Sequence, residues 1–279
     1  MSRLSNKIKI YFYSSFIAVA LTTIGYILSF MFAFDTPIAY FSGNSPLPYI
    51  AKYLLIFTVV WIFTLFISIP KGKLCGTPPT VSELSRTASI AVSVGFIICS
   101  IFRLIFVPAS ALATICTAMT LLSSVFFALN AIFPRSQNNI RALFGIVVIL
   151  WAAIAMTEAY VNRFVTMNSP IKILLMLSMM SVMFFMLYET RYLTERSLPR
   201  AYAVSTLIGI CLSTVLSLTF IIMYITGTYT VPEFIPTAIS ALLFSFYEIC
   251  RAVDFIALQS TQDTAATNDT DTAQENEQQ

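Results

Sequence analysis

Among the ionisable side chains in apolar segments of the sequence, five have the strongest claim to chemistry. Glu248, Arg251 and Asp254 occur near the end of one apolar run, and Arg103 and Glu158 occur near the ends of two others. An ionisable group inside a membrane span is costly to bury and is therefore a candidate functional residue. These five residues are the candidates for an intramembrane polar site, and Glu248, Arg251 and Asp254 could bind a proton, a cation or a polar headgroup.

The three charges in the last apolar run are spaced so that they can interact. Residues three apart are neighbours on a helix surface, so we expect Arg251 to be flanked by Glu248 and Asp254. The apolar helix 234–247 would be about 21 Å long, short of the roughly 30 Å hydrocarbon layer, so the triplet should enter the inner leaflet. Both mutual neutralisation and ligand binding remain open as its role. In a related upstream phrase, Glu189 and Arg191 are expected to anchor a span at the membrane boundary.

Arg103 and Glu158 are expected at a similar depth near the other face of the membrane. Arg103 lies about one turn from the end of a span at 87–107, and Glu158 lies in the outer part of a span at 141–161. The two side chains could pair with each other. Alternatively, each could extend separately to the outer headgroups, as long charged side chains commonly do.

The sequence lacks the residue sets of most catalytic and cofactor-binding centres. It contains no histidine, which removes His ligation of haem or zinc and any Ser-His or Cys-His nucleophile. Its five cysteines form no C-x-x-C pair and are typical of small buried side chains. We expect no catalytic residue, no cofactor, no metal site and no nucleic-acid partner, and enzymatic activity is not favoured.

Membrane-spanning helices must position these charges. Of the 279 residues, 58% are hydrophobic and 10% are charged, whereas an ordinary soluble domain has about 25% charged residues. Apolar runs of about 20 residues recur, and each is long enough to cross a bilayer as a helix. The sequence predicts an all-α, polytopic transmembrane helical bundle with about eight spans, at 10–34, 49–69, 87–107, 109–133, 141–161, 170–189, 201–227 and 234–256.

Three regions follow from this division of the chain. Residues 1–9 form a cytoplasmic N-terminal segment, and residues 10–258 form the transmembrane helical domain. Residues 259–279 are acidic, contain no lysine or arginine and have few apolar side chains. Such a segment cannot bury enough apolar surface to order itself, so it is expected to be a disordered cytoplasmic tail.

The distribution of lysine and arginine predicts the orientation of the chain. Cytoplasmic loops carry an excess of both residues. In an eight-span arrangement, twelve fall on one side: Arg3, Lys7, Lys9, Lys71, Lys73, Arg86, Arg135, Arg141, Arg191, Arg196, Arg200 and Arg251. Four fall on the other side: Lys52, Arg103, Arg163 and Lys172. Both termini are therefore expected in the cytoplasm, and the short outer loops favour a bacterial cytoplasmic membrane.

A short phrase recurs at the ends of the fourth, sixth and eighth spans. The aligned stretches are 126–131, 184–189 and 243–248, with offsets of 58 and 59 residues. Arg86, Arg141 and Arg200 recur at the starts of the third, fifth and seventh spans. Such a period is typical of tandem helical hairpins. Independent anchoring of each helix end by tyrosine and arginine remains the alternative.

Small residues indicate where helices pack together. Ser205, Gly209, Ser213 and Ser217 recur every four residues in the seventh span and predict a helix-packing face inside the bundle. In the fourth span, Ser110, Thr114 and Ala118 predict a second face of this kind. The sixth span is rich in large flexible side chains and is expected at the periphery of the bundle.

Two classes of function fit this sequence. The first is a small-solute transporter or permease component, which would place its intramembrane charges beside the substrate path. The alternative is a membrane scaffold, assembly or sensor subunit without catalytic activity. This alternative would use the basic cytoplasmic face and the acidic tail to bind a membrane or cytoplasmic protein. The lipid bilayer is the expected partner in both cases.

Overall fold

The computed structural model describes residues 2–35, 40–69, 74, 76–77, 79, 81–108, 110–133, 138–162, 166, 168–228 and 234–277. Side chains are described for these residues apart from 2–6, 65–66, 138 and 262–277. The helices found there are α1 (Ser2–Ala33), α2 (Leu47–Ser68), α3 (Glu83–Phe106), α4 (Ala111–Ile132), α5 (Asn138–Val161), α6 (Pro170–Leu193), α7 (Pro199–Ile225) and α8 (Ile235–Glu277). Two short antiparallel strands, β1 (Phe34–Asp35) and β2 (Tyr40–Phe41), join α1 to α2.

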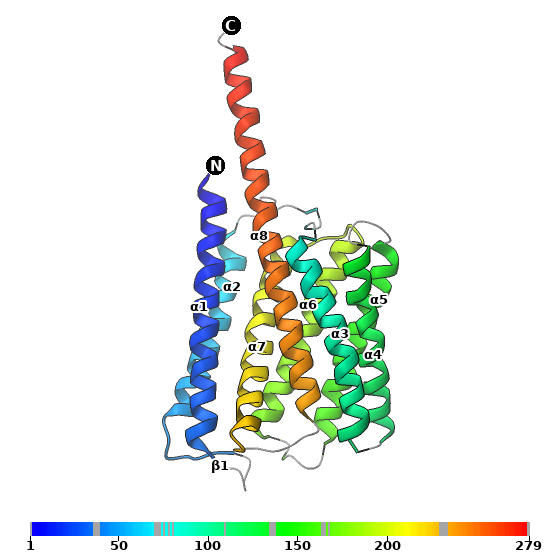
Figure 1. Cartoon of the computed structure of the whole chain (residues 1–279). Coiled ribbons are helices and arrows are strands. Elements are labelled where there is room, and N and C mark those ends of the chain that lie inside the picture. The colour runs from blue at the N-terminus through cyan, green and yellow to red at the C-terminus, as the bar shows by residue number, and fades with distance from the viewer. Residues whose placement is uncertain are drawn as a thin grey trace.

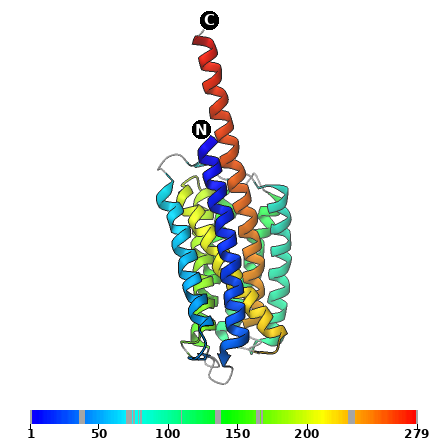
Figure 2. The ribbon, with the colours of Figure 1, turned by 90° about the vertical axis from the view of Figure 1, so that its left-hand side faces the viewer.

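The helices form an up-and-down bundle, which confirms the predicted all-α fold (Figure 1). From α3 to α8 each helix packs against the next one in sequence, and α3 also packs against α8, so that these six helices close into a ring. The α1–α2 hairpin lies outside this ring, against α7 and α8. Both ends of the chain lie at the same end of the bundle (Figure 2). We call this the terminal end, and the opposite one the far end.

Seven described helices, α1 to α7, are long and apolar enough to cross a membrane. The eighth predicted span corresponds to the part of α8 that lies within the bundle, where Glu248 and Arg251 interrupt the apolar sequence. A multi-pass membrane protein follows from these helices. Since α8 runs the length of the bundle beside the others (Figure 1), the sequence and the structure agree on eight helices in one bundle.

Local sequence sets several helix ends. The Ser82 and Ser110 side chains cap α3 and α4 by accepting hydrogen bonds from the backbone N–H groups of Ser85 (3.2 Å) and Ala113 (3.1 Å). Proline begins both α6 and α7, where its missing N–H costs nothing. After α7 the chain turns at Gly227, whose φ of 68° suits glycine. The starts of α6 and α7 agree with the positions of Pro170 and Pro199 in the sequence.

Three phenylalanines from alternate helices meet in the core. Phe244 of α8 makes edge-to-face contacts with Phe127 of α4 (centroids 6.0 Å apart) and Phe185 of α6 (5.7 Å). The three are fully buried. They occupy equivalent positions in the recurring phrase, and each lies on the second helix of its hairpin. This arrangement supports tandem hairpins. The glycine contacts do not repeat in the same way, because Gly95 of α3 packs against α8 of another hairpin, whereas Gly209 of α7 packs against α8 of its own hairpin.

Two expectations about helix faces are wrong. Ser110, Thr114 and Ala118 are exposed, and the buried polar residues of α4 instead include Thr117 and Thr120. The sixth helix is not peripheral, because α6 packs against α5, α7 and α8 and buries much of its length. A large apolar side chain satisfies lipid and protein surroundings equally well, so composition alone does not identify the lipid-facing helix.

The end of α8 extends beyond the bundle as a helix to Glu277 (Figure 1). The predicted disordered segment 259–279 overlaps this extension. A helix that stands clear of a bundle gains no stability from tertiary packing, and its presence here does not contradict disorder in solution. The disorder of residues 259–279 stays a prediction. Lys71, Lys73, Arg135 and Arg163, which contribute to the predicted orientation, lie outside the described residues.

Candidate functional site

Arg251 of α8 is held between two carboxylates inside the bundle. Its Nε donates to Oε1 of Glu189 at 3.0 Å, and a terminal nitrogen lies 2.9 Å from the same oxygen. The other terminal nitrogen donates to Oδ2 of Asp254 at 3.1 Å. All three side chains are at most 3% exposed. The expected contact between Arg251 and Asp254 is present, but the expected contact with Glu248 is wrong, because Glu189 of α6 takes that place.

This ionic cluster continues through hydrogen bonds to three further helices. The hydroxyl of Tyr247 donates to Glu189 (3.3 Å) and accepts from the Asn130 amide of α4 (3.2 Å). The Asn130 amide oxygen in turn accepts from Arg141 Nε of α5 at 2.7 Å. On the other side, Ser85 of α3 donates to Asp254 at 2.6 Å. The cluster therefore joins five helices, and its two arginines and two carboxylates balance in formal charge.

The start of α3 closes this cluster at the terminal end of the bundle. Asp254 also accepts a hydrogen bond from the backbone N–H of Ser82 at 3.4 Å, directly before α3. A carboxylate at a helix N-terminus is stabilised by the helix dipole and by unpaired N–H groups. The backbone oxygen of Pro79 accepts from Arg251 at 3.4 Å. Pro79 and Ser82 thus lie against the charges.

Glu189 was not expected in the site. The sequence places it at a boundary with Arg191, but the structure buries Glu189 (1% exposed) and leaves Arg191 exposed. The two residues differ because they lie on different faces of the last turns of α6. The signal that could have revealed Glu189 is the recurring phrase itself, since its third copy supplies Tyr247, which binds Glu189.

A second ionic pair lies at the far end of the bundle. Arg103 of α3 contacts both carboxylate oxygens of Glu158 of α5 at 2.5 Å, and it also donates to Thr237 of α8 (3.1 Å) and Thr117 of α4 (3.3 Å). Arg103 is 3% exposed. Its guanidinium is therefore turned into the bundle and joins four helices, so the two side chains pair and do not extend separately.

Glu248 differs from the other buried charged residues because neither of its oxygens has a hydrogen-bond partner among the described residues. It is fully buried. Its carboxyl group rests on the backbone of α7 at Gly209, where an added Cβ would overlap it. Gly209 thus provides the space for the carboxyl group. Close backbone approach at glycine is common between membrane helices.

The other three small residues on this face of α7 are also buried. Ser213 lies 3.4 Å from Ser178 of α6 through its hydroxyl. Ser205 and Ser217 donate to backbone oxygens of their own helix, at 2.9 and 2.6 Å. The face therefore contacts different neighbours along its length: α8 at Gly209 and α6 at Ser213.

The polar side chains of the two clusters are carboxylates, guanidinium groups, hydroxyls and one amide. Among the described residues, no three His, Cys, Asp or Glu side chains come together in a way that could hold a metal ion. The carboxylate groups in both clusters have partners of opposite charge, whereas the Glu248 carboxyl group has no hydrogen-bond partner in the part of the chain that the structure describes. The chain matches no protein-family model, no curated protein and no solved structure.

Proposed function

We propose that this multi-pass membrane protein is a small-solute transporter or permease component in which Glu248 takes up and releases a proton. The single observation that supports this role is the environment of Glu248, a fully buried carboxyl group that has no hydrogen-bond partner among the described residues and lies at the contact of α7 and α8. Ionisable residues at membrane depth commonly mark proton relays and ion pathways.

Protonation of Glu248 would couple to the packing of α7 against α8. A neutral carboxyl group fits the dry contact with Gly209 far better than a carboxylate, because an unpaired charge there would lack water and counter-ion. Loss of the proton would favour another arrangement of the two helices, in which the carboxylate reaches water or a cation. A proton would thereby shift the population of two conformations, as a coupled transporter requires.

The charged groups of the two paired clusters contrast with Glu248 because each has a partner. Arg251 has Glu189 and Asp254, and Arg103 has Glu158. A buried ion pair of this kind stays formed in both conformations, because breaking it would leave an uncompensated buried charge. The clusters would therefore keep the helices in register while the contact at Glu248 changes.

The test uses proteoliposomes containing a pH-sensitive dye, with sugars, amino acids and organic cations added outside in turn. We expect at least one of these probes to drive proton movement with the wild-type protein, and Glu248→Gln to reduce the rate at least tenfold. Glu83→Gln, at a residue whose side chain is 91% exposed, is the matched control and should keep the wild-type rate. Equal rates for Glu248→Gln and wild type at equal reconstitution would contradict the proposal.

A scaffold or assembly role is the second candidate, favoured by the extension of α8 past the bundle to Glu277 (Figure 1). The residues beyond 261 carry Asp263, Asp269, Asp271, Glu275 and Glu277 and no basic side chain. A basic surface of a membrane or cytoplasmic protein could bind them. Removal of 262–279 distinguishes the roles, because a transporter keeps its flux whereas a scaffold loses its co-purifying partner.

A further inference from the structure

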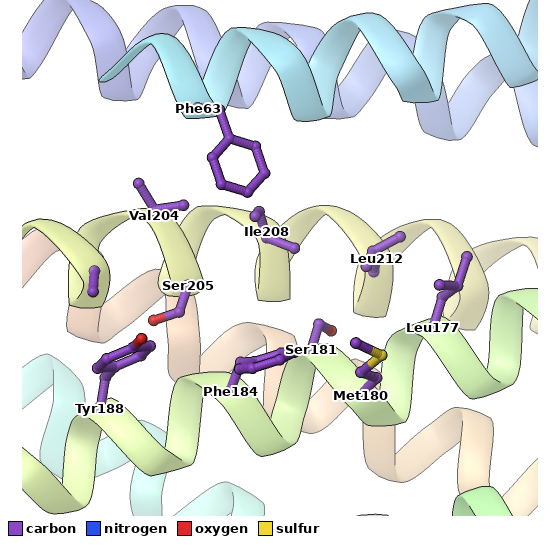
Figure 3. Close-up of a pocket in the computed structure, with 11 residues that line it drawn as sticks. Phe63, Leu177, Met180, Ser181, Phe184, Tyr188, Val204, Ser205, Ile208 and Leu212 are labelled. Atoms are coloured by element: carbon purple, nitrogen blue, oxygen red, sulfur yellow. The ribbon is translucent and has the colours of Figure 1, made fainter. Parts of the chain in front are cut away.

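An apolar groove with a volume of about 350 Å³ runs along the outside of the bundle between α2 and α6 (Figure 3). Its floor is formed by α7. Phe63 of α2 points toward this floor from one side, and α6 forms the other wall (Figure 3). Its lining includes Phe63, Leu177, Phe184, Tyr188, Val204 and Ile208.

The walls of this groove carry exposed aromatic side chains, whereas part of its floor is buried. Phe63 and Phe184 are 48% and 47% exposed, whereas Val204 is 6% exposed. The groove lies along α2, α6 and α7, which are all apolar enough to cross a membrane, so it opens sideways toward lipid. A hydrocarbon chain is favoured over water in the groove, because hydration of the surrounding apolar surface is unfavourable.

The shape and polarity of the groove suit a single alkyl chain. Leu177 and Tyr188 are eleven positions apart on α6, which corresponds to about 16 Å of helix. The two serines in the lining, Ser181 and Ser205, donate their hydroxyls to backbone oxygens of Ser178 (2.7 Å) and Tyr202 (2.9 Å). Both hydroxyls are therefore satisfied within their own helices and require no polar ligand.

Positive charge gathers beside one end of the groove. Tyr188 lies at this end, Arg191 follows one turn later on α6, and Arg200 directly precedes the lining residue Ala201. The stretch from Arg191 to Arg200 contains three arginines and one acidic residue, Glu195, and so carries two net positive charges. Arg191 is exposed. Such a site attracts an anionic phosphate group in addition to the chain.

We propose that the groove binds one acyl chain of an anionic phospholipid from the surrounding bilayer, with the phosphate of its headgroup beside Arg191 and Arg200. The chain lies along α7 between Phe63 and Phe184. This site is on the α2–α6 side of α7, whereas Glu248 contacts α7 at Gly209. The inference does not depend on proton coupling at Glu248.

The first test measures binding of a homologous series of lysophosphatidylglycerols to delipidated wild-type protein by native mass spectrometry. Affinity should rise roughly three- to fourfold for each added methylene and level off once the extended chain reaches the groove length of about 16 Å. Lysophosphatidylcholines of equal length should bind at least fivefold more weakly. Equal affinity for the two headgroups, or no levelling with chain length, would overturn the proposal.

The second test fills the groove. Ile208 points into it (Figure 3), so Ile208→Trp should reduce binding of phosphatidylglycerol at least tenfold. Ile101→Trp, at a 52% exposed position on α3, is the matched control and should bind like the wild type. Retention of phosphatidylglycerol by a folded Ile208→Trp protein would overturn the proposal, and the chain-length series decides the matter if that variant does not fold.

The headgroup contact has a test of its own. Arg191→Gln should remove most of the preference for phosphatidylglycerol over phosphatidylcholine while leaving the dependence on chain length intact. Arg86→Gln removes an arginine from the same end of the bundle, at the start of α3, and should leave the preference unchanged. An equal loss in both variants would indicate general attraction to the basic end of the bundle and would overturn the assigned headgroup site.

Discussion

Individual residues in this protein show how charge can be buried inside a membrane bundle. Arg251 contacts Glu189 and Asp254, and Tyr247 and Ser85 bind those carboxylates in turn. Each charged group therefore exchanges water for a partner of opposite charge and for hydrogen bonds. Such a cluster is costly to break, because removing one member leaves the others buried without compensation.

Arg251→Gln should lower the free energy of unfolding by about 3 kcal/mol. The glutamine cannot neutralise Glu189 and Asp254, which would remain buried as a pair of like charges. Unfolding in mixed detergent micelles with increasing dodecyl sulfate provides the measurement. The matched control is Arg191→Gln, whose exposed side chain should change stability by less than about 1 kcal/mol. Equal losses for the two variants would mean that burial of Arg251 has no energetic consequence.

A double-mutant cycle separates the ion pair from general packing. Glu189→Gln combined with Arg251→Gln should cost less than the sum of the two single changes, with a coupling of about 1–3 kcal/mol. The reason is that each single change leaves one unpaired charge and the double change leaves fewer. Strictly additive effects would contradict direct pairing of these two side chains.

At the scale of elements, the contact of α7 with α8 depends on Gly209. A methyl group at this position would overlap the Glu248 carboxyl group. Gly209→Ala should therefore destabilise the protein by about 1–3 kcal/mol, and the loss should shrink when Glu248 is also changed to Ala. Gly43→Ala is the control, because nothing lies within 4 Å of a Cβ added there. Thermal unfolding in detergent measures these differences. If Gly209→Ala lowers stability equally with and without the Glu248 side chain, Glu248 is not the group that contacts Gly209.

The sequence predicts the helices better than it predicts their faces. Apolar run length and proline positions place α1 to α7 to within a few residues in most cases, because a bilayer requires a minimum helix length and proline stops helices. The predicted buried face of α4 and the predicted peripheral position of α6 are both wrong. The reason is that small or apolar residues in a membrane protein do not separate inside from outside as they do in water.

The candidate site was only partly predictable for a related reason. The spacing of Arg251 and Asp254 follows from helix geometry alone, so their contact could be predicted from the sequence. The contact of Arg251 with Glu189 joins residues 62 positions apart, and it depends on how α6 turns toward α8. Helical spacing also allowed Glu248 to approach Arg251, but the packing against Gly209 directs it to α7 instead.

At the scale of the whole molecule, three hairpins form a ring with a shared centre. Phe127, Phe185 and Phe244 meet there from α4, α6 and α8. The two ionic clusters lie toward opposite ends of this ring and connect α3, α4, α5 and α8 at both ends, with α6 joining only at the terminal end. The α1–α2 hairpin packs outside the ring, and α2 provides one wall of the apolar groove.

The eight-span bundle requires α8 to cross the membrane as the eighth span despite the charges it carries. The most direct measurement is labelling, with a membrane-impermeant maleimide, of single cysteines introduced into a variant whose five native cysteines are changed to serine, in intact cells and in opened membranes. We predict that Ser5→Cys and Thr272→Cys label only after the membranes are opened, whereas Gly43→Cys, in the turn between α1 and α2, labels in intact cells. Labelling of Ser5→Cys and Thr272→Cys from opposite sides would contradict the eight-span bundle.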